Sequence, residues 1–178
     1  IYKPEKGEGL FEGENIFNNE AKKQQLFFMP DDLYFSPNAN MLKMADFYNA
    51  YYDYYNFTTF RRLVDAFGLD PKKRIAGFSK GMQRQAEMVL ALSAHPKLLL
   101  LDEPAAGMNP NETQELMNDI TFIREKFGIT ILLIEHDLKF VSGICDRITV
   151  LNFGTVIAEG NTKDALSDPE VIKAYIGK

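Results

Sequence analysis

The sequence has 178 residues and a formal net charge of −5, with 46% hydrophobic and 25% charged residues. This length and composition are typical of one folded domain with a sizeable core and exclude a disordered chain. The acidic balance, without a cluster of lysines and arginines, argues against nucleic acid as a partner. No stretch approaches the ~18 consecutive apolar residues of a membrane span, and a single cysteine, Cys145, excludes an internal disulfide.

The first part of the chain predicts short strands followed by helices. Residues 9–17 (GLFEGENIF) have the pattern of a short strand and a glycine turn, and Leu26–Met29 is a second short apolar run that Pro30 ends. Residues 41–68 are crowded with aromatics at helical spacing, which predicts two helices ending at Gly68. We expect most of these aromatics to fill a small helical core, because a ligand-binding cluster is a rarer use of this pattern.

Two apolar runs further along predict buried parallel strands. Ser79 precedes a helical stretch that ends before Pro96, and Leu98–Leu101 follows it as an unbroken apolar run. Residues 129–134 form a second such run. Unbroken runs of this length favour strands of a parallel sheet that is covered on both faces.

The helix between these two strands has clear start and stop signals. Asn109 is a good cap, Pro110 fits the first helical position, and Glu112 can complete a capping box. Gly128 is suited to end the helix. The expected apolar stripe consists of Leu116, Ile120, Ile123 and Phe127.

The remaining sequence predicts small elements around a hairpin. A short helix follows the second strand, a hairpin turns around residues 152–154, and a C-terminal helix opens at residues 168–169. Strand, helix and strand in this order predict an α/β fold with right-handed crossovers.

Acidic residues follow both predicted parallel strands. Asp102 and Glu103 end the first, and Glu135, His136 and Asp137 follow the second. Ligands of open parallel sheets bind beyond the carboxyl ends of the strands, and neighbouring strand residues point to opposite faces. One carboxylate there can hold hydrated Mg²⁺, its neighbour can take a proton from water, and His136 can contact a phosphate oxygen. Position alone leaves a second interpretation equally open, in which the acids cap loops and His136 is structural.

Residues 78–85, FSKGMQRQ, place Ser79 and Gly81 at the start of a predicted helix. Free backbone N–H groups and the helix dipole favour an anion at such an end, and Gly81 lets the backbone approach it closely. Alone, this is the pattern of an ordinary capped helix. Beside the acidic strand end it favours a phosphate site.

Three motifs together resemble the ATPase domain of ABC transporters. KLLLLDEPAAGMNP (97–110) resembles the Walker B strand and D-loop of that family, ILLIEHD (131–137) its switch strand, and FSKGMQRQ (78–85) its signature motif. The resemblance covers essentially the whole chain. It implies a P-loop NTPase-like α/β fold, a mostly parallel sheet with helices on both faces plus a helical subdomain.

The resemblance also implies domain boundaries. An ATPase core would comprise residues 1–29 and 96–178, and a helical signature subdomain would comprise residues 30–95. Both ends of the chain resemble ATPase subunits of branched-chain amino acid importers, whereas the middle resembles exporter-type ABC ATPases. A chimaera and a divergent relative both give this mixture.

The resemblance assigns roles to the residues at the strand ends. Asp102 would support Mg²⁺, Glu103 would be the catalytic base, and His136 would hold the γ-phosphate side. Asp31 stands where the family carries glutamine, and it either reaches Mg²⁺ through water or is a solvated loop residue. The residues implied to contact ATP held by the opposite subunit are Ser79, Lys80, Gly81 and Gln83.

The implied activity is hydrolysis of MgATP at a head-to-tail dimer interface. The partners would be a second ATPase subunit, in a homo- or heterodimer, and transmembrane permease subunits that carry out transport. The location would be cytoplasmic, at the inner face of the cell membrane. The alternative is a truncated or chimaeric ABC-like module, used for folding or interaction, with no ATP turnover.

The phosphate-binding pattern of this family, G-x-x-x-x-G-K-[ST], is missing from the sequence, whose one Gly-Lys pair is at 177–178. Family members carry this Walker A motif upstream of a segment resembling IYKP, so we expect the chain to begin just after the Walker A helix and to be inactive alone. We expect the missing strand to lie beside strand 98–101, and its absence to leave two strands without a shared neighbour. Three explanations stay open. The upstream segment exists in the molecule, the chain is a fragment or a recombinant, or the remaining sheet closes up, for example by pairing with another copy.

Overall fold

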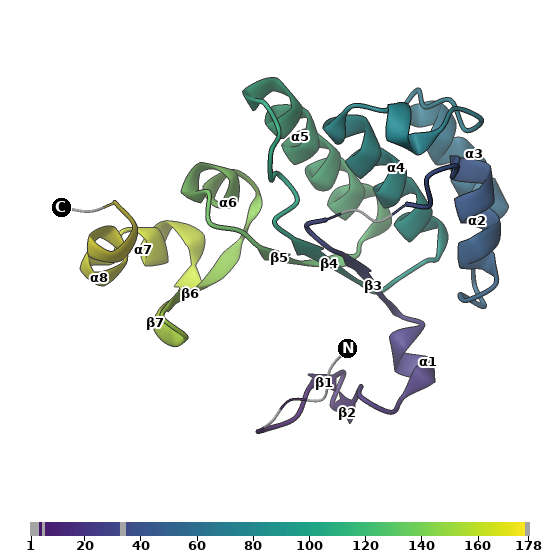
Figure 1. Cartoon of the computed structure of the whole chain (residues 1–178). Coiled ribbons are helices and arrows are strands. Elements are labelled where there is room, and N and C mark those ends of the chain that lie inside the picture. Colours follow the sequence, from purple (N-terminus) through teal and green to yellow (C-terminus); the bar gives the residue numbers. More distant parts are fainter. Residues whose placement is uncertain (1–3, 5, 33–34, 177–178) are drawn as a thin grey trace. The chain divides into compact units, whose positions relative to one another are not determined.

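The computed structural model describes residues 4, 6–32 and 35–176, and it divides into two units, Ile1–Ile134 and Glu135–Lys178 (Figure 1). No helix of the described part of the chain is long and apolar enough to cross a membrane. The elements of the first unit are β1 Leu10–Phe11, β2 Glu14–Asn15, α1 Glu20–Lys23, β3 Leu26–Met29, α2 Met41–Asn49, α3 Phe57–Ala66, a 3₁₀ helix Ile75–Gly77, α4 Lys80–Ser93, β4 Leu98–Asp102, α5 Pro110–Phe127 and β5 Thr130–Ile134.

The first unit is built on a three-stranded parallel sheet in the order β3-β4-β5. β4 pairs on both sides without a shift, so that Leu100 lies between Phe28 and Leu132. The expectation that the strand at 98–101 lacks a neighbour is therefore wrong. Both of its backbone edges are occupied, and among the described residues β3 and β5 each pair on one side alone.

The two faces of this sheet differ sharply. Figure 1 shows α4 and α5 along one side of the strands, and on that face Leu99 and Leu101 are buried. On the other face Phe28, Leu132 and Ile134 are 54%, 54% and 59% exposed. The prediction of a sheet covered on both faces is thus not met in the described residues of the first unit, because these side chains of the second face are exposed.

Helix α4 forms the centre of the helical layer. It packs against α2, α3 and α5, and its second half, from Ala86 to Ser93, is buried throughout. The aromatic-rich segment supplies Tyr55 and Phe60 to this core, as expected, but leaves others exposed. The exposed members are Phe47, Tyr51 and Tyr54, and the first two line a shallow groove of about 310 Å³ beside α1.

The predicted helix starts and stops are confirmed. Asn109 accepts hydrogen bonds from the backbone N–H groups of Asn111 and Glu112, and the Glu112 carboxylate accepts one from the N–H of Asn109 at 3.3 Å. This closed capping box fixes the start of α5. Gly128 ends the helix in the left-handed conformation at φ 61°, which glycine adopts at little cost.

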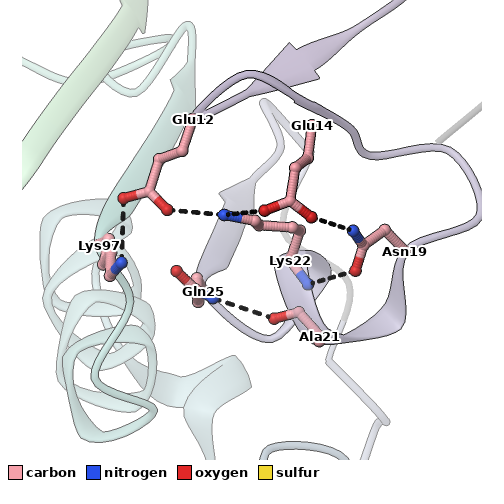
Figure 2. Close-up of polar contacts among 7 residues, drawn as sticks. All are labelled: Glu12, Glu14, Asn19, Ala21, Lys22, Gln25 and Lys97. Atoms are coloured by element: carbon pink, nitrogen blue, oxygen red, sulfur yellow. Dashed lines mark hydrogen bonds and ion pairs between the residues drawn. The ribbon is translucent and has the colours of Figure 1, made fainter.

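The N-terminal hairpin is fastened by an ion-pair network (Figure 2). Glu12 and Gly13 both have positive φ, as a tight two-residue turn requires. The Lys22 ammonium lies 2.8 Å from the Glu12 carboxylate and 3.0 Å from that of Glu14, and Lys97 contacts Glu12 at 3.0 Å. Lys97 directly precedes β4, so the network connects the hairpin to the start of the central strand.

The second unit contains a hairpin and short helices. Its elements are α6 Leu138–Ile144, β6 Arg147–Asn152, β7 Thr155–Asn161, α7 Thr162–Leu166, α8 Pro169–Val171 and a π-helical turn Ile172–Ile176. β6 and β7 are antiparallel around Phe153–Gly154, and Asp168 caps α8, both as the sequence predicts. Phe140 and Val171 are buried within this unit.

The contrast between the two sheet faces gives a stability prediction. Leu99→Ala removes a fully buried side chain and is expected to lower the free energy of unfolding by ~2–5 kcal/mol. Leu132→Ala, on the exposed face, is expected to cost less than ~1 kcal/mol. Urea unfolding of both variants measures the difference, and equal losses would contradict the exposure of the Leu132 face.

Candidate functional site

The acidic end of β4 carries the first part of the candidate site. Asp102 is the last residue of the strand, paired in register with Ile134. Glu103 leaves the strand with φ +41°, a conformation that non-glycine residues seldom adopt and that costs of order 1–3 kcal/mol. Its N–H donates to the Ile134 carbonyl at 2.9 Å, and its carbonyl accepts from the Ala106 N–H at 3.0 Å. The backbone of the predicted base is therefore held from both sides.

A buried arginine joins this strand end to the loop after β3. The Arg84 side chain of α4 is 4% exposed. Its guanidinium donates to the carbonyls of Pro30 at 2.6 Å and Asp31 at 2.5 Å, and to that of Glu103 at 3.5 Å. The Asp31 carboxylate lies 3.8 Å from the same guanidinium. Asp31 and Glu103, both predicted site residues, thus share one cation.

A second charged residue lies beneath this cation. Glu87, one helical turn along α4, is 5% exposed and forms an ion pair with Arg84 at 3.6 Å. Burial raises the pKa of Glu87 to about 8, against the opposing effect of Arg84. Burial also lowers the pKa of Arg84, and the carboxylates of Glu87, Asp31 and Asp102 oppose that change. For both residues the effect of burial on the pKa exceeds that of the opposite charge, so the site is built over a desolvated pair whose mutual attraction does not offset its burial.

The signature-like segment starts α4 as expected. The Ser79 hydroxyl accepts from the Met82 N–H at 3.3 Å, which caps the helix. A carboxylate, however, already lies beside this helix end. A Cβ on Gly81 would lie 3.3 Å from Cγ of Glu112, and the Ser79 hydroxyl, then the Asn109 and Gly81 amides, lower the pKa of Glu112.

Lys80 and Gln83 make local contacts in this structure. Lys80 reaches the loop after β4, where a Cβ on Gly107 would meet its ammonium at 2.4 Å. Gly107 has φ +67°, so a side chain there is both strained and obstructed. Gln83 donates to the carbonyls of Ile75 and Phe78, which holds the turn before α4. The structure thus brings Ser79, Lys80 and Gly81 beside the loop that follows the acidic strand end.

His136 belongs to the second unit. Its side chain is 73% exposed, and Nδ1 lies 3.7 Å from the buried Glu135 carboxylate, which also accepts from the backbone N–H of His136. Among the described residues, no three histidine, cysteine, aspartate or glutamate side chains gather as a metal cluster. Asp102 and Asp31 carry carboxylates, the oxygen ligand type that suits Mg²⁺, which is commonly bound by one or two carboxylates plus waters and phosphates.

The contacts of three residues in this region are not predicted from the sequence. Arg84 and Glu87 are three residues apart on a helix whose second half is otherwise apolar, and this spacing is the one signal that points to a buried pair. The capping-box pattern predicts Glu112 as a helix cap, but its proximity to Ser79 depends on how α4 and α5 pack.

Comparison with known proteins identifies the family. The family model described as "ABC transporter" matches residues 1–106, more than half of the chain. The chain belongs to the ABC transporter ATP-binding family. The predicted family is thereby confirmed, and the matched range includes the signature-like segment 78–85 and the strand that precedes Asp102 and Glu103.

Curated relatives of this family member include ATP-binding proteins of amino acid transport. The high-affinity branched-chain amino acid transport ATP-binding protein LivG of Salmonella typhimurium is 45% identical over 106 residues, which are 60% of this chain and 42% of LivG. The methionine import ATP-binding protein MetN of Histophilus somni is 36% identical over 114 residues, 63% of this chain and 33% of MetN. These matches thus extend over less than half the length of either relative.

Solved cassettes share the fold of this ABC family member. An ABC transporter cassette in its ADP conformation has a TM-score of 0.80 at 25% identity, over 99% of this chain and 79% of the cassette. A nucleotide-free cassette gives 0.79 at 24% identity, with the same coverage. The α/β fold with a parallel sheet and helices is therefore that of an ABC cassette.

The buried Glu87 predicts a pH dependence of stability. The pKa of Glu87 is about 8 in the folded state, against the ordinary 4.5. Between pH 4.5 and pH 8 the folded state therefore keeps a proton on Glu87 that the unfolded state loses. Stability should therefore fall as pH rises from 4.5 towards 8, by at most ~1.4 kcal/mol per pH unit from this group. Glu87→Gln is expected to remove this slope, as measured by urea unfolding across that pH range.

The exposed Glu125 offers a matched control for this prediction. Glu125→Gln makes the same chemical change at the surface of α5. Its slope of unfolding free energy against pH should equal that of the wild type. An unchanged slope in Glu87→Gln would contradict the raised pKa, whatever the absolute stability of that variant.

Proposed function

We propose that this chain is part of an ATP-binding subunit of an ABC transporter, and that MgATP is hydrolysed at a head-to-tail interface between two such subunits. The observation that carries the proposal is the meeting of the loops after β3 and β4 around Arg84, beside the capped start of α4. Acidic groups and a helix N-terminus then lie together at the carboxyl ends of parallel strands, where open sheets bind ligands.

In this proposal Asp102 and Asp31 hold the hydrated Mg²⁺, which supplies positive charge against the phosphate oxygens. Glu103 accepts the proton of the attacking water, and its tethered backbone limits the positions that its carboxylate can take. His136 contacts the γ-phosphate side. The residues that face ATP bound to the opposite subunit are Ser79, Lys80, Gly81 and Gln83.

The proposed partners follow from this arrangement. The phosphate-binding loop is supplied from outside residues 1–178, because these residues contain no G-x-x-x-x-G-K-[ST] pattern. A second ATPase subunit completes the site, and transmembrane permease subunits place it at the cytoplasmic face of the membrane. The likeness to LivG and MetN supports import, with amino acids as the transported class.

One observation favours the alternative, a non-catalytic module of the same fold. The Glu112 carboxylate lies at the start of α4, where the opposite subunit's phosphate would bind. Two anions at one helix end repel each other. Such a module would keep its fold while binding no nucleotide at this end of the helix.

Glu103→Gln tests catalysis directly. The amide cannot accept the proton, so we expect ATP turnover, measured in a dimer in which the phosphate-binding loop is supplied on the Glu103 side of the site, to fall ~10²-fold or more. Nucleotide binding should be retained. Wild-type turnover in Glu103→Gln would favour the non-catalytic module, and Glu125→Gln serves as the surface control.

Ser79→Arg tests the opposed-subunit site. A long side chain at the start of α4 is expected to block the approach of the partner's ATP and to weaken ATP-dependent association at least ~10-fold, or ~1.4 kcal/mol. Ser142→Arg adds the same charge at an exposed position of α6 and should have no effect. The measurement is sedimentation with and without MgATP, and association that ignores Ser79→Arg would count against the interface.

A further inference from the structure

We propose that Arg84 is a positioning residue that holds the loop after β3 in register with the acidic end of β4. The significance of this register rests on the proposed function, since the two segments carry Asp31, Asp102 and Glu103. Arg84 itself is buried on α4; it contacts Glu103 through the backbone carbonyl, and Asp31 through both its backbone carbonyl and its carboxylate.

The geometry of the guanidinium is that of a clamp. Its two terminal nitrogens donate to adjacent carbonyls, Pro30 at 2.6 Å and Asp31 at 2.5 Å, which lie 54 and 53 residues away in the sequence. The nitrogen that reaches Asp31 also lies 3.5 Å from the Glu103 carbonyl on the other segment. One rigid planar group thus fixes the distance between the loop after β3 and the loop after β4.

Lysine does not provide the same contacts. Guanidinium has five N–H donors in a fixed fork, whereas the lysine ammonium is a single point at the end of a flexible stem. An ammonium at this place keeps the positive charge beside Asp31, Asp102 and Glu87 but cannot donate from two nitrogens to two neighbouring carbonyls. Arg84→Lys therefore separates the clamp from the charge.

Burial of this charge is costly, which argues against a purely structural purpose. Desolvation of an ion costs several kcal/mol in a protein, and a buried ion pair is often replaced by apolar residues with little loss of stability. Arg84 and Glu87 are both almost fully buried on α4, where the other buried residues are apolar except for Ser93. We therefore explain the buried pair by its effect on conformation, since it sets the separation of the two loops, and not by a contribution to stability.

The clamp acts where the backbone is strained. Glu103 has φ +41°, and its peptide groups are held by Ile134 on one side and by Ala106 and Arg84 on the other. Loss of the guanidinium leaves the Glu103 carbonyl with one donor fewer and frees the loop at Pro30 and Asp31. The Glu103 backbone then relaxes more often towards an unstrained conformation, which breaks its bond to Ile134.

Amide hydrogen exchange of the full chain tests this without nucleotide. Arg84→Lys is expected to speed exchange at the Glu103 and Ala106 amides at least tenfold, with the Thr113 and Gly128 amides of α5 unchanged. Because a folding defect would accelerate all of these amides, the α5 pair reports it. Unchanged exchange at Glu103 and Ala106 overturns the proposal.

A second variant separates the clamp from the buried charge. The double variant Arg84→Met, Glu87→Leu removes both charges and keeps apolar volume, so it should remain folded. It should show the same fast exchange at Glu103 as Arg84→Lys. If exchange at Glu103 matches that of wild type in the folded double variant, Arg84 does not position this residue.

Steady-state kinetics of a dimer in which the phosphate-binding loop is supplied on the Glu103 side of the site give the readout for the reaction. Arg84→Lys is expected to lower kcat at least tenfold and to change KM for ATP less than twofold, because the clamp orients Glu103 without touching nucleotide. A raised KM with unchanged kcat overturns the assignment. If wild type itself shows no turnover, the proposed function fails while the exchange experiment still decides the role of Arg84.

Discussion

The parallel pairing of β4 on both sides is the constraint on which the described site depends. β3 and β5 hold the central strand in continuous register, so the segments after β3 and β4 and the last carbonyl of β5 end at the same edge. The site uses all three ends. Asp31 follows β3, Asp102 closes β4, and the Ile134 carbonyl of β5 fixes the Glu103 N–H.

Helix α4 determines how these strand ends face one another. Its first residues form the signature-like cap, and its next turn carries Arg84 and Glu87 under the two loops. One helix therefore presents a surface for an anion and, a turn later, the cation that holds the acidic loops together. Because both functions lie on one rigid element, a shift of α4 would change both at once.

Sequence reasoning predicts much of this fold because its signals are local. The apolar runs give β3, β4 and β5, and the pattern at Asn109, Pro110 and Glu112 gives the start of α5 to the residue. Local signals fail where the answer depends on packing partners. An apolar run such as β5 indicates burial, yet Leu132 and Ile134 are more than half exposed.

The candidate site divides in the same way. Strand ends and the helix cap follow from sequence, so Asp102, Glu103 and Ser79 are found by position. Arg84 is missed because its acceptors are backbone carbonyls more than fifty residues away. Every residue has such a carbonyl, so the sequence does not indicate which ones accept. The sequence also predicts the wrong neighbour for β4, because an apolar run shows that a segment is a strand but not which strands it pairs with.

Glu112 sets the electrostatic balance of the proposed interface. Its carboxylate accepts from the Asn109 amide and lies against Ser79 and Gly81, so the positive end of the α4 dipole already has an anion beside it. A phosphate that reaches Ser79 must move this carboxylate aside or approach with a cation between the two anions. Moving Glu112 opens the capping box of α5, which connects occupancy of the α4 end to the order of the loop that follows Glu103.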